Sequence, residues 1–318
     1  MYRLSWEITI GKYRVQTVKE VKIATSVLNL SDTASITLPG KYLDKWKDIE
    51  DKIKVGDEVV IKLGYDDDNE TEFNGYLKRI SRDNNSLVLE CEDALYLLNK
   101  NVENKEYSDV SLQVLLNDIL SQVDSNLRLE CDYTYSMKKM VVFHQTALDV
   151  LKKIHEETKA NIWFENKTLH IHPVYDTLEK GSTSIIYDTK INVQSNELKW
   201  VDKNDKKMKI EIAYNMPDGN LKKESFGDDK GETVTRYAAT SDDTELKKIA
   251  ENEYNLWNYS GYEGDFTGWL IPRTKSGESI RLRDTERNED GTYYVTGVEI
   301  EFGQNGAKRK VTLGRKLG

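Results

Sequence analysis

The stretch VGDEVVIKL at residues 55–63 has a second version in SGESIRLRD at residues 276–284. Each segment has a glycine, an acidic residue and then aliphatic side chains at alternate positions. This alternation is typical of a strand with one buried face. The later segments FNGYL and VTGVE, each followed by a polar turn and a last alternating strand, extend the similarity.

Glycines mark the same places in both versions. Gly56 is followed nineteen residues later by Gly75, and Gly277 is followed twenty residues later by Gly297. Four features in one order predict that the chain carries two versions of one barrel, in which Gly56 and Gly75 superpose on Gly277 and Gly297. The alternative is that unrelated antiparallel domains share the same hairpin punctuation.

The remaining chain completes a three-part organisation. We expect a first β-barrel over residues 1–100, an α+β module over residues 101–175, and a second β-barrel over residues 176–318 with an inserted helix near residues 242–257. The predicted fold class is therefore mainly β, with two similar barrels flanking a small module of two helices and a β-hairpin.

Helical spacing of apolar residues indicates the helices. A stripe from Val110 to Val123 predicts one helix, with Ser108 or Asp109 as its cap. A second helix is expected to start near Thr146, which with Asp149 resembles a capping box. These two helices precede a hairpin predicted over residues 161–173.

Two further helices are expected inside the barrels. Leu43, Trp46, Ile49 and Ile53 recur at helical intervals and predict a short amphipathic helix in the first barrel. In the second barrel, Asp242 with Glu245 is the expected cap of the inserted helix.

Composition excludes several classes of protein. The 46 basic and 55 acidic residues give a net charge of −9, spread evenly along the chain, so a free-standing nucleic-acid binder is not expected. Cys91 and Cys131 do not make a disulfide scaffold and are interpreted as reduced and structural. We find neither a secretory signal nor an apolar run long enough to span a membrane, and we expect synthesis in a cytoplasm.

The four histidines are the strongest candidates for a metal site. His170 and His172 lie two apart on a predicted strand and face the same side. A zinc site needs a third ligand, which His144 or His155 could supply in principle. No HExxH or cysteine-pair spacing accompanies them, so a solvated strand face is preferred and no metal or cofactor is predicted.

Other charged and glycine-rich segments have simple interpretations. The acidic run at residues 66–70 lacks the pattern of a calcium loop and is interpreted as a hairpin tip. GYEGDFTG at residues 261–268 is interpreted as a bend, and the lysine cluster at residues 203–209 as a solvated hairpin. No nucleophile elbow appears, so we predict no enzyme activity and no catalytic residues.

Two segments resemble a known family. They are similar to the late-control-gene-D family of phage tail proteins. The first is GDFTGWLIPRTKSGESIRLRD together with the glycine-rich run that ends the sequence, and the second is MVVFHQTALDVLKKIHEETKANIWFENKTLHIHP. That family forms the baseplate hub of contractile tails and is related to the hub portion of type VI secretion spike proteins. The resemblance in domain order runs from about Trp6 to Gly314. The sequence shows no β-helical spike, which favours a separate hub subunit.

The resemblance implies a homotrimeric ring of six barrels that joins the tail tube protein to the spike protein. It places the chain in the virion, with no membrane insertion and no tight nucleic-acid binding, although DNA passes through the ring. Three alternatives stay open: a cell-wall-degrading tail-tip enzyme, the hub of a type VI-like secretion or injection machine, and a carbohydrate-binding adhesin suggested by the Trp and Tyr content.

Overall fold

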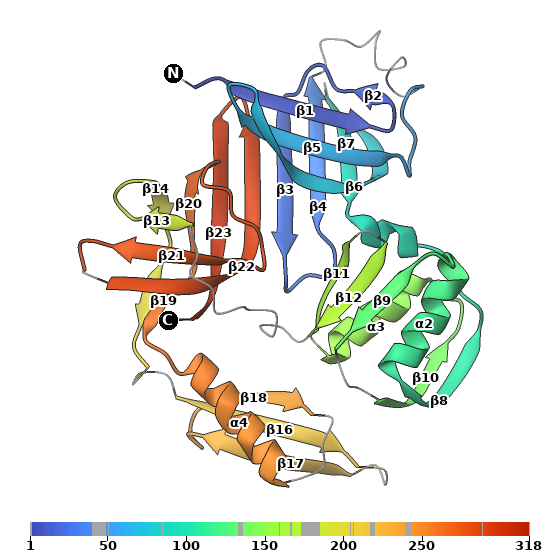
Figure 1. Cartoon of the computed structure of the whole chain (residues 1–318), viewed down its shortest axis with the longest axis vertical. Coiled ribbons are helices and arrows are strands. Elements are labelled where there is room, and N and C mark those ends of the chain that lie inside the picture. The colour runs from blue at the N-terminus through green and yellow to red at the C-terminus, as the bar shows by residue number, and fades with distance from the viewer. Residues whose placement is uncertain are drawn as a thin grey trace.

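The computed structural model shows a large β-sheet with two smaller α+β units attached to it (Figure 1). The residues that it describes are 2–39, 49, 51–83, 86–132, 136–158, 160–165, 167–172, 185–203, 205, 207–216, 220–238, 243–287 and 289–317. The short helix predicted around Leu43 and Trp46 lies mostly outside these residues. Ile53, at the end of that stripe, is buried in the core.

The N-terminal half of the large sheet is built from the first seven strands. Alternate side chains of these strands are buried, as expected for a sheet with one face in the core. The strands are β1 (Leu4–Ile10), β2 (Tyr13–Arg14), β3 (Glu20–Ser26), β4 (Thr33–Pro39), β5 (Glu58–Tyr65), β6 (Asp68–Asp83) and β7 (Ser86–Glu92).

The C-terminal half uses six strands that come from the last 135 or so residues of the chain. Long antiparallel strands β22 and β23 form its centre, and the short parallel pair of β13 and β21 lies at its side. The strands are β13 (Ile186–Asp188), β14 (Val193–Asn196), β20 (Asp265–Trp269), β21 (Ser279–Asp284), β22 (Glu289–Gly303) and β23 (Gly306–Lys316).

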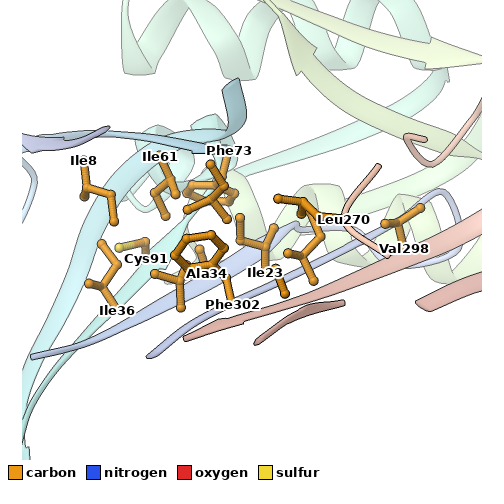
Figure 2. Close-up of a cluster of buried hydrophobic side chains, with 14 of the residues drawn as sticks. Ile8, Ile23, Ala34, Ile36, Ile61, Phe73, Cys91, Leu270, Val298 and Phe302 are labelled. Carbon is orange, nitrogen blue, oxygen red and sulfur yellow. The ribbon is translucent and has the colours of Figure 1, made fainter. Parts of the chain in front are cut away.

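The two halves form one continuous sheet. Strand β3 pairs antiparallel with β22, from Glu20↔Gly303 to Ser26↔Gly297, so residues 271 to 283 positions apart in the sequence lie side by side. One apolar cluster runs under both halves, and Figure 2 shows Ile8 and Ile61 together with Phe302. The predicted β-rich fold class is confirmed, but the two expected barrels share a sheet and a core instead of forming separate bodies.

The first glycines of the repeat have the same hydrogen-bonding position. Gly56 donates its N–H to Leu77 O at 2.8 Å, and Gly277 donates to Val295 O at 2.9 Å. In return, the amides of Leu77 and Val295 donate to the residue that follows each glycine, both at 2.9 Å. Both glycines have positive φ, 93° and 87°, a conformation that side chains rarely adopt.

The second glycines are placed differently. Gly75 faces Val59 two residues before Leu77, whereas Gly297 faces Ser26 and comes two residues after Val295. The registers of the two hairpins are the same, since Val59 faces Gly75 as Ile280 faces Tyr293, so Gly297 lies four residues beyond the position equivalent to Gly75. The strand registers therefore do not favour the predicted superposition of Gly75 on Gly297.

The middle module packs two helices against short strands, much as predicted. Helix α2 begins at Leu112, with Ser111 as its cap in place of Ser108 or Asp109, which lie in a strand. Thr146 and Asp149 form the predicted capping box. The elements are the 3₁₀ helix η2 (Ala94–Leu98), β8 (Lys105–Ser111), α2 (Leu112–Val123), β9 (Arg128–Cys131), β10 (Ser136–Val142), α3 (Ala147–Thr158), β11 (Asn161–Glu165) and β12 (Thr168–His172).

The predicted inserted helix belongs to a small unit of its own. Helix α4 (Asp243–Trp257) packs Leu246 and Ala250 against Ile210 and Ile212 of a three-stranded sheet. The expected cap Asp242 lies outside the described residues. The strands of this sheet are β16 (Met208–Asn215), β17 (Leu221–Gly227) and β18 (Glu232–Tyr237), and the pair β15 (Lys199–Val201) and β19 (Gly261–Glu263) leads to it. Among the described helices, none is both long and apolar enough to cross a bilayer.

Candidate functional site

A buried ion pair joins the two halves of the large sheet. Glu72 of β6 lies 2.7 Å from Arg309 of β23, and the two side chains are 4% and 1% exposed. Arg309 also donates to the carbonyls of Leu270 and Thr274, at 3.0 and 2.8 Å. Burial raises the pKa of Glu72, and the charge and hydrogen bond of Arg309 oppose that rise.

A second arginine extends this contact to the surface. Arg273 lies 3.6 Å from Glu72 and 3.0 Å from Glu70, and it donates to the carbonyls of Leu63 and Asp68. The loop that carries Arg273 is thereby bound to the β5–β6 hairpin. We call Glu72, Arg273 and Arg309 the inter-half clamp.

Two half-buried carboxylates lie where the N-terminal half meets the middle module. Asp32 accepts a hydrogen bond from Ser26 N at 2.9 Å, and Asp93 accepts from the amides of Asp32 and Leu95, at 2.9 and 3.0 Å. Burial raises the pKa of Asp32 to about 6. Burial, together with the nearby charges of Asp32 and Glu92, raises the pKa of Asp93 to about 7, against the lowering effect of its backbone hydrogen bonds.

A cavity of about 580 Å³ lies between these groups. Its walls come from all three parts of the fold and include Asp93, Glu72, Trp163 and Glu278. The carboxylates at its wall already accept hydrogen bonds from backbone amides or arginine; Glu278, for example, accepts from Lys275 N at 2.9 Å. Carboxylates used in this way hold segments of the fold together, which is a structural role.

The face of the β11–β12–β9 sheet that points away from the helices collects imidazole, indole and carboxylate groups. His170 of β12 lies between Trp163 of β11 and Glu130 of β9 in the sheet register. Its ring stacks on Trp163 with centroids 5.0 Å apart, and its Nδ1 lies 3.4 Å from Glu130 Oε2. His172 Nδ1 lies 2.7 Å from Asp132 Oδ2.

The other histidines are not part of this face. His155 contacts the carbonyls of Ala160 and Leu28, and His144 is exposed beside Phe143. Neither His144 nor His155 places its imidazole ring beside His170 and His172. Sequence reasoning missed Glu130 as a neighbour, because only the parallel pairing of β9 with β12 places it there.

The remaining predicted features have structural roles in the described residues. The run at 66–70 is a hairpin tip, in which Asp66 and Asp67 have positive φ and Arg3 contacts both. Within the lysine cluster, Lys209 pairs with Asp229 at 2.7 Å. Cys91 is buried and its pKa is raised to about 12 by burial, so this thiol is inert at neutral pH.

Comparison with solved structures shows which proteins share this fold. The tail protein of Neisseria meningitidis MC58 matches with a TM-score of 0.67 at 13% identity, over 100% of this chain and 98% of that chain. The 43 kDa tail protein of prophage MuSo2 from Shewanella oneidensis matches with a TM-score of 0.65 at 13% identity, over 98% of both chains. The E. coli c3393 protein, a component of the type VI secretion system, matches with a TM-score of 0.60 at 10% identity, over 97% of this chain and 76% of that chain.

The fold is thus the one seen in phage tail proteins and in a type VI secretion component. The family model described as the Alg8 N-terminal domain matches residues 13–303, and the chain belongs to that family. This is not the late-control-gene-D family that the sequence resembles, so that finer assignment is not shown. No curated protein sequence matches the chain.

Proposed function

We propose that the chain is a structural hub subunit of a phage or prophage contractile-tail baseplate, as its resemblance to the late-control-gene-D family implies. The observation that carries this is the fold match to two tail proteins over 98% or more of this chain and 98% of theirs. In this proposal three copies form a ring that joins the tail tube to the central spike within the virion.

The internal symmetry of the sheet supports a ring of three. Gly56 and Gly277 hold equivalent turns in the two halves, so each chain presents two related β units. A cyclic trimer then has six such units, which can meet a six-fold tube on one face and a three-fold spike on the other. The inter-half clamp fixes the angle between the two units, and an adaptor needs that angle to be constant.

The secretion-machine alternative shares the fold but is less well supported. The type VI component is matched over 76% of its own length, against 98% for each of the two tail proteins. We infer a role without catalysis, because the described carboxylates at the central cavity are engaged in hydrogen bonds. The tail-tip enzyme and the adhesin stay as rivals for direct test.

The oligomeric state of the purified full-length chain tests the proposal. Light scattering coupled to gel filtration should give 3 × 36.7 = 110 kDa, and electron microscopy should show rings that bind the tail tube protein made from the same genome. A chain that stays monomeric at high concentration, even with tube and spike proteins added, would refute the hub. Clearing of peptidoglycan in a zymogram, or saturable binding on a glycan array, would favour the rivals.

A further inference from the structure

We propose that Glu130, His170 and His172 form a binding site for a divalent transition metal, with Zn²⁺ as the best match. Their ligand atoms all lie within 4.8 Å of one another. Among the histidine, cysteine, aspartate and glutamate side chains in the described part of the chain, these three form the group that comes close enough to hold an ion. The sequence offered His144 or His155 as a third ligand and showed no zinc-motif spacing, whereas the fold supplies Glu130 of β9 instead.

The sheet register explains why the three groups meet. His170 and His172 are two apart on β12, so both project from the same face. Glu130 faces His170 directly in the parallel β9–β12 ladder. The opposite face carries Leu169 and Ile171, which are fully buried against the helices. The ligand face is therefore held in place by a well-packed inner face.

The donor set suits zinc better than the hard cations. Two imidazoles and one carboxylate are the protein ligands of many zinc sites, whereas Mg²⁺ and Ca²⁺ prefer oxygen ligands. Bond lengths of about 2.0–2.2 Å in a tetrahedron place donor atoms about 3.4 Å apart. Glu130 Oε2 is already 3.4 Å from His170 Nδ1. The Glu130 side chain is 59% exposed, so it can move to close the remaining gap.

A neighbouring carboxylate orients one of the imidazoles. Asp132 lies 2.7 Å from His172 Nδ1, and a proton shared there leaves the lone pair on Nε2. A carboxylate behind a ligating histidine is a common feature of zinc sites, because it fixes the tautomer and raises the basicity of the ring. His172 is buried, so its ring is also held by packing.

The consequence of binding is a cross-link at the edge of the module. Strand β9 is four residues long and pairs with β12 alone in its sheet. An ion shared by Glu130 and the two histidines would join β9 to β12 through side chains as well as backbone. The site thus stabilises the middle module and is independent of the proposed hub role.

Zinc titration of the full chain, purified without a tag and treated with chelator, tests the site. We expect one Zn²⁺ per chain at neutral pH, a higher melting temperature with Zn²⁺, and no such change with Mg²⁺. His170→Asn and Glu130→Gln should each weaken Zn²⁺ binding at least tenfold, and Asp132→Asn should weaken it about 10–100-fold. His144→Gln is the matched control, because this exposed histidine lies outside the site, and it should bind like the parent.

Trp163 provides a second readout that does not depend on stability. Its ring is 5.0 Å from His170 and 5.1 Å from His172, so bound Co²⁺ should quench its fluorescence. Trp163→Phe should lose that quenching and keep one Co²⁺ per chain. Absence of saturable Zn²⁺ binding, or binding that His170→Asn and Glu130→Gln leave unchanged, would overturn the proposal.

Discussion

The two halves of the large sheet share a turn but differ in how their interiors are stabilised. The N-terminal half buries aliphatic side chains such as Ile8, Ile36 and Ile61. The C-terminal half also buries aliphatic side chains, such as Ile280, but adds Tyr187 and Tyr293, whose hydroxyls are hydrogen-bonded. A repeated backbone frame can thus keep its turns while one copy gains polar contacts.

Those tyrosine hydroxyls fix loops in the half that carries the insertion. Tyr187 contacts Thr274 at 2.9 Å and donates to Pro272 O at 3.0 Å, and Tyr293 accepts from Tyr262 N. These contacts hold the loop that supplies Arg273 and the strand that leads back from α4. The C-terminal half therefore presents a fixed loop to the N-terminal half, and the clamp joins them there.

Breaking the clamp from the C-terminal side should have the largest effect. Arg309→Met removes a cation that is 1% exposed and leaves Glu72 buried without its closest charge partner. We expect a loss of about 3–5 kcal/mol in the free energy of unfolding, measured by urea denaturation. Arg281→Met is the control, since its ion pair with Asp290 is nearly half exposed, and should cost no more than about 1 kcal/mol.

The double variant separates charge from packing. Glu72→Leu combined with Arg309→Met removes both charges, and replacement of a buried pair by apolar groups is often neutral or stabilising. The double variant should therefore be more stable than Arg309→Met alone. Equal losses for Arg309→Met and Arg281→Met would show that the two halves are not held by this pair.

Acidity should affect carboxylates of the two halves in opposite directions. The pKa of Asp32 is about 6 in the folded chain against an ordinary value of 3.8, so the folded state binds more protons between these values. The stability from Asp32 is complete below pH 4 and is lost as the pH rises through about 6, by roughly 3 kcal/mol. Asp32→Asn should flatten this part of a plot of unfolding free energy against pH.

Asp284 of the C-terminal half is the matched comparison. Burial alone would raise its pKa, but hydrogen bonds from Tyr262 and from the amides of Arg287 and Glu286 leave its pKa lowered. Its contribution to stability is present above its unfolded pKa and is lost as the pH falls, so Asp284→Asn should change the acid side of the curve. Identical pH profiles for both variants would contradict this difference between the halves.

Alanine substitution at the second glycines of the repeat, Gly75 and Gly297, should reduce the stability by different amounts. A Cβ at Gly75 would lie 2.2 Å from the backbone oxygen of Glu92, whereas at Gly297 the nearest atom is Thr25 O at 3.4 Å. Gly75→Ala should cost about 1–3 kcal/mol through overpacking, and Gly297→Ala clearly less. Thermal unfolding of both variants measures this. Equal costs would favour the correspondence that the sequence predicts for this pair.

The first glycines should instead behave alike. A Cβ at Gly56 or at Gly277 would make ordinary van der Waals contact, 3.5 and 3.6 Å from the nearest side-chain atoms, so only the positive φ opposes a side chain. Each alanine substitution should cost about 1–2 kcal/mol, and the two costs should agree. A large difference in melting temperature between the two variants would break the proposed equivalence of the turns.

Local features of this fold could be predicted from the sequence, and long-range contacts could not. The helix after Thr146 follows from apolar spacing and a cap within four residues. The Glu72–Arg309 contact joins residues 237 positions apart, and no local pattern marks it. Glu130 was missed for a similar reason, because the register of a parallel pair depends on connections outside the strands.

The inserted unit shows the same limit. The spacing of Leu246 and Ala250 predicted helix α4, but the sequence did not show that β16, β17 and β18 leave the large sheet to cover it. Strand pattern alone identifies a strand without identifying its sheet. The shared core of the two halves was missed in the same way, since both halves alternate as separate barrels would.

The last prediction, which rests on the proposed hub, concerns what both halves share: a negative charge. Three chains carry 3 × (−9) = −27 charges, and a channel that releases DNA should not hold it through counterion release to lysines. We expect the inner wall to be acidic or neutral, with the lysine cluster at residues 203–209 on other surfaces; there Lys209 is already paired with Asp229.

The purified chain should accordingly show little affinity for duplex DNA even at low salt, where screening is weakest. Fluorescence anisotropy with a labelled duplex measures this, and a basic protein of similar size serves as the positive control. Binding in the low micromolar range with a steep salt dependence would contradict the prediction, because such a slope counts phosphate contacts made by lysine and arginine. A trimer structure with lysines around the channel would contradict it as well, and neither result would change the fold or the clamp on which the comparison of the two halves rests.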